Sequence, residues 1–331
     1  MKGHIKILDF LRGIAALLVV MFHFATAILP TIKPNYLSGI LEYGKYGVQV
    51  FFVISGFIIP YAMLKSNYTV GKYFKFMWRR IIRINPPYYV SILLSFILYF
   101  SAILIVHRPI NGMEWPGINF MALFGNLTFT VPFLDTWWYN PVYWTLAIEF
   151  QFYLIIGLML PAITSKKEWL SFTVLIATLA VGFIDFGWFF HFSSFFVLGI
   201  VLFMQREKLM SNIPLIILSL IAIICCYFQR GWVELIFGVI TFFIILSGIN
   251  INSKFTNFLG KISYSLYITH WAIGLMAEIA LKRLINIHEY PMGKIVMLFV
   301  YTGISIVFAA IFYKYIEKPA INYSKRIKQT S

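Results

Sequence analysis

The sequence predicts an all-α, polytopic integral membrane protein, and three observations support this prediction. Hydrophobic residues make up 60% of the 331 residues and charged residues only 12%, which is about half the ~25% that a typical soluble domain carries. The apolar residues fall in blocks that are long enough to cross a bilayer, roughly 17–25 residues each. Open strands and loops cannot cross lipid, because their backbone polar groups would be left unpaired. Each block is therefore predicted to be a helix.

Ten apolar blocks follow one another along the chain. They cover about residues 8–29, 46–63, 86–106, 142–162, 169–185, 188–204, 213–229, 232–249, 262–284 and 293–316. Very short connections join the fifth block to the sixth and the seventh to the eighth, which predicts two helical hairpins. Segment 117–131 is interrupted by polar residues, so it is either an eleventh span or a re-entrant or interfacial segment. No repeat or long linker divides the chain, which predicts a single membrane domain over residues 1–331 without an additional soluble domain.

Lysine and arginine residues lie mostly in short patches between the blocks, and the net charge is +15. If the N-terminus is cytoplasmic, nineteen of these 27 residues lie on the cytoplasmic side and seven on the external side, with Arg12 inside the first block. This bias follows the positive-inside rule. It predicts a multi-pass protein of the cell (inner, or cytoplasmic) membrane, surrounded by lipid, with both termini in the cytoplasm. It excludes nucleic acid as a partner.

The first block carries two polar residues at a helical spacing. Arg12 and His23 are eleven residues apart, which places them on one face of a helix and about 16 Å apart along its axis. A charged side chain inside a membrane costs at least ~2.5–3.5 kcal/mol and therefore indicates a functional site. With the N-terminus inside, Arg12 lies near the cytosol and His23 deeper in the membrane. The alternative is a snorkelling arginine and a histidine that is hydrogen-bonded within the helix bundle.

A second basic pair occurs in the segment WRRIIRINPPYY. Arg80 and Arg83 are three residues apart and point the same way on a helix. Pro86 and Pro87 follow them and are expected to break that helix. Two guanidinium groups in this position could bind phosphates in bidentate fashion. The alternative is that the pair only anchors the helix on the cytoplasmic side.

Glu149, in the segment YWTLAIEFQFY, is the third candidate. Counted from the ends of their blocks, Glu149 lies about 10 Å and His23 about 9 Å from the external edge. A carboxylate and an imidazole at one depth could form an acid–base dyad in which Glu149 orients His23. The alternative is a structural contact between helices, worth about 1 kcal/mol.

Weaker signals come from tryptophan, histidine and cysteine residues. Four of the nine tryptophans, Trp115, Trp137, Trp138 and Trp144, lie in the external stretch 107–144. Their rings could stack on sugars or form an interfacial aromatic belt, and Trp144 is the one we assign to substrate binding. His270 is a lone intramembrane histidine that either binds substrate or is structural. The adjacent residues Cys225 and Cys226 suit neither a disulfide framework nor a tetrahedral metal site, so no metal is expected.

Six segments, taken in order, resemble the membrane acyltransferase-3 family, which includes bacterial O-antigen and exopolysaccharide O-acetyltransferases. LDFLRGIAALLVVMFHF has Arg12 and His23 in the family's R-x10-H pattern, and GVQVFFVISGFII is similar to its second helix. RRIIRINPPYY matches the RxxR segment through Arg80 and Arg83. YWTLAIEFQFY matches W-S-L-x-x-E, with Thr145 in place of the usual serine. LGKISYSLYITHW and YIEKPAI match the two closing signatures.

The resemblance implies an acyl-CoA donor, usually acetyl-CoA, bound on the cytoplasmic side. It implies an acceptor hydroxyl on the other side of the membrane, on a glycan or lipid-linked glycan of the cell surface. It also implies that His23 is catalytic and that Arg12, Arg80 and Arg83 hold the donor, Arg12 counting in both groups. We therefore expect an O-acyltransferase in which His23 deprotonates the acceptor with help from Glu149.

A transporter or flippase for a glycan intermediate is the rival interpretation, because some relatives of the family are assigned export roles. A transporter needs no site for donor phosphates. Binding of acyl-CoA therefore separates the two interpretations.

Overall fold

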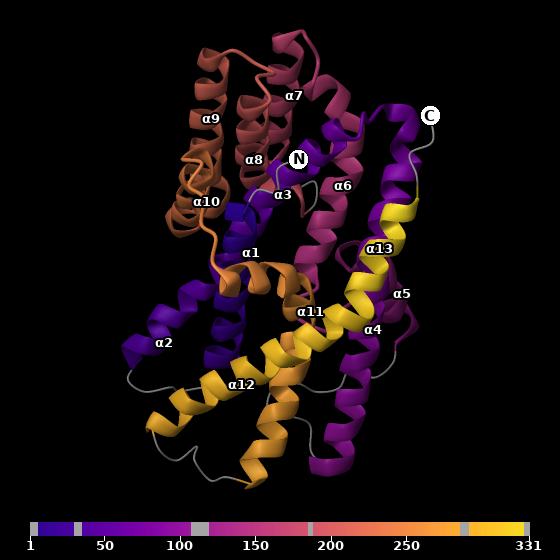
Figure 1. Ribbon diagram of the computed structural model, residues 1–331, viewed down its shortest axis with the longest axis vertical. Coiled ribbons are helices and arrows are strands. Elements are labelled where there is room, and N and C mark those ends of the chain that lie inside the picture. The colour runs from indigo at the N-terminus through magenta and orange to yellow at the C-terminus, as the bar shows by residue number, and fades with distance from the viewer. Residues whose placement is uncertain (1–5, 30–34, 107–118, 185–187, 285–290, 328–331) are drawn as a thin grey trace.

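Helices account for all the regular structure that is described. The computed structural model describes residues 6–29, 35–106, 119–184, 188–284 and 291–327, and within these ranges it contains helices and no strands (Figure 1). The prediction of an all-α protein is confirmed.

Each of the ten predicted blocks contains a helix. These are α1 (Lys6–His23), α3 (Gly47–Lys65), α4 (Tyr73–Val106), α6 (Trp144–Ile163), α7 (Glu168–Val181), α8 (Ser193–Arg206), α9 (Asn212–Arg230), α10 (Trp232–Leu246), α11 (Lys254–Leu284) and α12 (Pro291–Phe312). Shorter elements are α2 (Asn35–Glu42), α5 (Phe120–Thr128), α13 (Lys318–Arg326), the π-helical turns η1 (Phe24–Ile28) and η7 (Tyr313–Glu317), and the 3-10 turns η2 (Tyr43–Tyr46), η3 (Val70–Lys72), η4 (Val131–Phe133) and η5 (Phe190–Phe192).

Six helical segments are long and apolar enough to cross a membrane. They are Lys6–Ile28, Leu37–Lys65, Val70–Ser101, Trp144–Ile163, Asn212–Arg230 and Met292–Arg326. Three shorter apolar helices accompany them. The number of ten membrane spans therefore stays a prediction. Nine residues of helix reach about 13 Å, so α5 is too short for the ~30 Å hydrocarbon core. The described part of segment 117–131 therefore provides no eleventh span.

The expected helix break at Pro86 and Pro87 is wrong. Both prolines lie inside α4, which continues to Val106. A proline removes a backbone donor, but neighbouring helices can supply replacement hydrogen bonds inside a membrane bundle. Next to the carbonyls of Ile82 and Arg83, which the two prolines leave without their helical donors, the hydroxyl of Tyr264 on α11 donates to the carbonyl oxygen of Ile84 at 2.9 Å.

Two pairs of helices are packed closely enough to fix their relative directions. At Gly260 of α11, a Cβ atom would lie 2.4 Å from the carbonyl oxygen of Asp9 on α1. Further along, Gly274 faces the ring of Phe24, so both chains advance together and the helices are parallel. Such close approach of backbones is what small residues permit in membrane bundles.

A second parallel pair consists of α3 and α8. Phe52 contacts Phe192 with ring centroids 5.2 Å apart. One turn further, a Cβ at Gly56 would lie 2.1 Å from the carbonyl oxygen of Phe196. The first and ninth predicted spans, and the second and sixth, should each run in the same direction, and they do. Which side of the membrane faces the cytoplasm stays a prediction.

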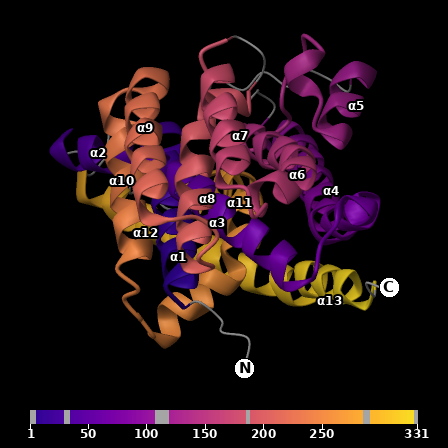
Figure 2. The same ribbon diagram turned by 90° about the horizontal axis from the view of Figure 1, so that it is seen from above.

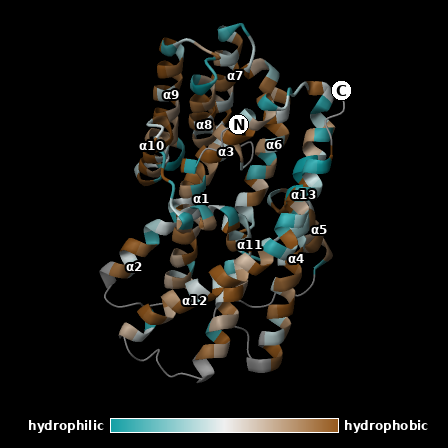
Figure 3. Cartoon of the chain, viewed as in Figure 1, coloured by the Kyte–Doolittle hydropathy of each residue, from teal (hydrophilic) through white to brown (hydrophobic). Residues whose placement is uncertain are grey.

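The remaining helices pack around the two parallel pairs, α1 with α11 and α3 with α8. Seen from above, α7, α8, α9 and α10 stand side by side as one group, whereas α13 passes α4 on its way to the C-terminus (Figure 2). Hydrophobic residues dominate α9, α10 and α12, and α13 is mainly hydrophilic (Figure 3). On α9 the exposed side chains include Ile213, Ile216 and Phe228. Such extensive exposed apolar surface is typical of a membrane protein.

Candidate active site

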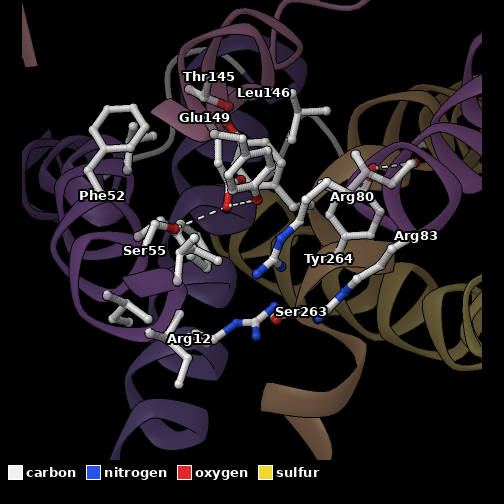
Figure 4. Close-up of a pocket in the computed structure, with 18 of the residues that line it drawn as sticks. Arg12, Phe52, Ser55, Arg80, Arg83, Thr145, Leu146, Glu149, Ser263 and Tyr264 are labelled. Carbon is white, nitrogen blue, oxygen red and sulfur yellow. Dashed lines mark hydrogen bonds between the residues drawn. The ribbon is translucent and has the colours of Figure 1, made fainter. Parts of the chain in front are cut away.

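Three arginines from two helices meet in one cavity. The cavity has a volume of about 170 Å³ and is lined by Arg12 of α1 and by Arg80 and Arg83 of α4. The three guanidinium groups point toward a shared space beside Ser263 (Figure 4). The structure thus brings together the two basic pairs that the sequence singled out separately.

Glu149 lines the same cavity. Its carboxylate accepts hydrogen bonds from the hydroxyl of Ser55, at 3.0 Å, and from that of Tyr153 (Figure 4). The guanidinium carbon of Arg80 lies 5.2 Å from the ring centroid of Tyr153 and 5.3 Å from that of Phe76, within the range of cation–π attraction. Tyr153 therefore connects the carboxylate to the cation.

A second carboxylate, Glu317 at the end of η7, was missed by the sequence analysis as a site residue. It is buried, it lines the cavity, and it accepts hydrogen bonds from the backbone amide, at 3.2 Å, and the hydroxyl of Ser265. Its charge interacts with those of Arg12 and Arg83. The available signal was an acidic residue directly after the last apolar block, within YIEKPAI.

The charges lining the cavity do not cancel. Three guanidinium groups face two carboxylates, so the described lining carries one excess positive charge when all five groups are ionised. Most of the other lining side chains are apolar, and between apolar walls such an excess attracts anions more strongly than it would at an open surface.

The expected contact between Glu149 and His23 is not formed. The carboxylate is held by Ser55 and Tyr153, while His23 hydrogen-bonds to His270. The sequence estimate placed the start of α6 at the external edge, but the non-helical stretch 134–143 that precedes α6 is itself partly buried. Since α6 begins inside the protein, Glu149 reaches the level of the arginines.

His23 and His270 form a second centre away from the cavity. The Nδ1 atom of His23 lies 2.9 Å from the Nε2 atom of His270, and the ring centroids are 5.1 Å apart. His270 is fully buried and His23 is half-buried, with the edge of Trp271 against its ring. His270 is therefore not the isolated residue that its sequence context indicated. In the described ranges, no group of three histidine, cysteine or acidic residues could hold a metal ion.

Trp144 lies in an aromatic cluster and is absent from the residues that line the arginine cavity. It is half-buried at the start of α6, with ring centroids 5.6 Å from Phe192 and 6.4 Å from Trp188. Its role in binding a sugar stays a prediction. Trp115, expected to belong to the same external group, lies outside the described residues.

Comparison with known proteins identifies the family. The acyltransferase-3 family model, described as an acyltransferase domain, matches residues 5–314. O-acetyltransferase OatA of Staphylococcus aureus (strain NCTC 8325 / PS 47) is 23% identical over 363 residues, covering 94% of this chain and 56% of OatA. A protein of Staphylococcus aureus (strain COL), provisionally named an O-acetyltransferase, is 25% identical over 375 residues with the same two coverages.

The chain spans about half the length of the curated relatives it matches. No solved structure gives a significant match. The family model nevertheless covers nearly all of the described helices, including every residue of the arginine cavity except Glu317, and both histidines. The chain belongs to the acyltransferase-3 family.

Proposed function

We propose that this protein is a membrane O-acyltransferase. It moves an acyl group, which we propose to be acetyl, from acyl-CoA on the cytoplasmic side to a hydroxyl of a cell-surface glycan or lipid-linked glycan. Family membership and the O-acetyltransferase names of the staphylococcal relatives support the reaction class. The observation that carries the proposal is the convergence of three guanidinium groups in a cavity with an excess positive charge.

The donor phosphates bind in this cavity. Arg80 and Arg83 contribute charge-assisted hydrogen bonds from α4, and Arg12 contributes them from α1. Glu149 and Glu317 belong to the donor site in this proposal, because their carboxylates line the same cavity as the three guanidinium groups.

The base lies at the other end of α1. Eleven residues of helix separate Arg12 from His23, which corresponds to about 16 Å. A donor whose phosphates bind at the arginines must therefore reach His23 with an extended arm, as the pantetheine arm of CoA can.

For direct transfer, the bonds and protons balance as follows. The acceptor hydroxyl gives its proton to a ring nitrogen of His23, and its oxygen forms a bond to the acyl carbon. The carbon–sulfur bond of the thioester breaks, and the CoA sulfur leaves as a thiolate. The thiolate takes up the proton from His23, so the products are an ester and CoA with His23 restored.

The test is acyl-CoA binding and transfer by the purified protein in lipid nanodiscs. We expect radiolabelled acetyl-CoA to bind, and surface glycans from cells that contain the protein to show an acetyl mass increment. Arg83→Ala should weaken binding, while Arg79→Ala is a matched control because Arg79 neighbours the site on α4 without lining the cavity. Glycan export without any acyl-CoA binding would favour the transporter interpretation.

A further inference from the structure

The ring of His270 is oriented by the backbone of its own helix. Its Nδ1 atom lies 2.7 Å from the carbonyl oxygen of Tyr267 and 3.2 Å from that of Leu266. A carbonyl oxygen can only accept a hydrogen bond. The Nδ1 atom of His270 must therefore carry a hydrogen and donate.

The other nitrogen of His270 is then an acceptor. The side chain is fully buried, and its hydrogen-bond partners are two carbonyls and the imidazole of His23, none of which is an anion. A second proton would place an uncompensated charge inside the protein, which is costly. The neutral ring has its lone pair on Nε2.

This lone pair determines the tautomer of His23. The Nδ1 atom of His23 lies 2.9 Å from Nε2 of His270 and must be the donor of that hydrogen bond. A neutral imidazole that carries its hydrogen on Nδ1 has its lone pair on Nε2. We infer that His270 is a positioning residue that holds His23 in the tautomer whose Nε2 can take a proton from the acceptor hydroxyl.

The inference rests on the proposed function, because it gives His23 the role of base. It replaces the orienting role that the sequence assigned to Glu149. The close packing of α1 against α11, at Gly260 and at Gly274, holds the two histidines at a fixed separation. The backbone carbonyls of α11 thus orient the ring of His270, and His270 in turn fixes the tautomer of His23.

A neutral orienting group differs from the carboxylate that orients the base in many hydrolases. It fixes the tautomer and the ring direction but offers no full negative charge to the imidazolium that forms during transfer. The hydrogen bond from His23 Nδ1 to His270 still strengthens when His23 becomes charged. The remaining charge is removed when the thiolate leaves and takes up the proton.

Two variants at position 270 separate orientation from packing. Glutamine can place its amide oxygen near the former position of Nε2 and accept from His23, whereas leucine has no acceptor. We expect His270→Leu to lower kcat by about 10- to 100-fold, the loss found when a group that orients a metal-binding imidazole is removed, with the KM for acyl-CoA unchanged. His270→Gln should retain most of the wild-type kcat.

A second readout does not depend on turnover. In protein labelled with ¹⁵N-histidine, the ring nitrogen shifts report which nitrogen carries the hydrogen, and the His23 signals can be assigned by their loss in His23→Gln. We expect the Nδ1–H tautomer in the wild type and in His270→Gln, and a mixture of tautomers in His270→Leu.

The Nε2–H tautomer of His23 in the wild type would overturn the inference, and this holds even if His270→Leu does not fold. A folded His270→Leu protein with wild-type kcat and unchanged His23 signals would overturn it as well. If the wild-type protein transfers no acyl group while His23 shows the expected tautomer, then the proposed function fails and the orientation by His270 stands.

Discussion

The two polar centres on α1 are held in different ways. Around Arg12, segments from α3, α4, α6, α11 and η7 supply side chains to one cavity, and the charged groups there leave one excess positive charge. Around His23, the described polar contacts are the hydrogen bond to His270, whose other nitrogen is held by backbone carbonyls, and a contact with the backbone of Val19 on the same helix. A site that binds a flexible anion can tolerate adjustment of long side chains. A catalytic imidazole must keep one ring orientation. Backbone carbonyls within a helix change position less than long side chains do, so they suit this task.

The largest contrast that we expect is that the Arg12 end of α1 lies toward the cytoplasm and the His23 end toward the outside of the cell. The two native cysteines are buried and can be replaced to give a cysteine-free background. In that background, Lys166→Cys should react with a membrane-impermeant maleimide only after the cells are opened, because the loop after α6 is predicted to be cytoplasmic.

Glu42→Cys, in α2, should by contrast react in intact cells. Both positions are exposed, so a lack of reaction at either reports its side rather than its burial. The opposite pattern would invert the topology and place the arginine cavity away from the cytosolic acyl-CoA pool.

The second largest effect is expected at His23. A general base contributes about 10²–10⁴-fold to turnover, so His23→Ala and His23→Gln should lower kcat by this factor. Binding of acyl-CoA should be unchanged, because His23 does not line the arginine cavity. Isothermal titration and single-turnover transfer measure the two properties separately. A folded His23→Gln protein with near-normal turnover would show that His23 is structural.

An intermediate effect is expected at the arginines. Each phosphate contact that Arg80→Ala or Arg83→Ala removes is worth ~1.5–3 kcal/mol, which is about a 10- to 150-fold loss of acyl-CoA affinity. Lysine should restore only part of it, since it lacks the bidentate geometry. Arg79→Ala supplies the control. If both alanine variants bind acyl-CoA like the wild type, the pair only anchors α4.

Local chemistry was predictable from the sequence, and the meeting of distant segments was not. The spacing of Arg12 and His23 along one helix depends only on helical periodicity, and both residues lie in α1 as expected. The depth of Glu149 cannot be predicted by counting residues from the start of its apolar block, because that start does not lie at the membrane edge. Nothing in the stretch 134–143 indicated that it enters the protein and lowers the start of α6.

The contact between His23 and His270 could not be predicted from the sequence for a related reason. It requires α1 and α11, 247 residues apart at the two histidines, to lie in contact and in one register. The glycines that permit this contact, such as Gly13 and Gly260, are scattered singly in the sequence. Their role becomes visible only when the opposing backbone is in place.

The smallest effect that we predict is at Glu149, and it tests the correction directly. Glu149→Gln removes one negative charge from the cavity while its amide oxygen can still accept from Ser55 and Tyr153. At an effective dielectric constant of about 20, one charge roughly 10 Å from a phosphate is worth about 1–2 kcal/mol. The KM for acyl-CoA should therefore decrease by about 5- to 30-fold, which is the opposite direction to the arginine variants, and kcat should change little.

Ser55→Ala is the matched control for Glu149→Gln, because it removes a hydrogen bond to the same carboxylate without changing the charge of the cavity. It should leave the salt dependence of acyl-CoA binding as it is in the wild type, whereas Glu149→Gln should make that dependence steeper, since the excess positive charge then rises from one to two. If Glu149→Gln instead lowers kcat a hundredfold at unchanged KM, the carboxylate acts on the base after all. His23 and Glu149 would then have to approach each other during turnover, and the two centres of α1 would work as one.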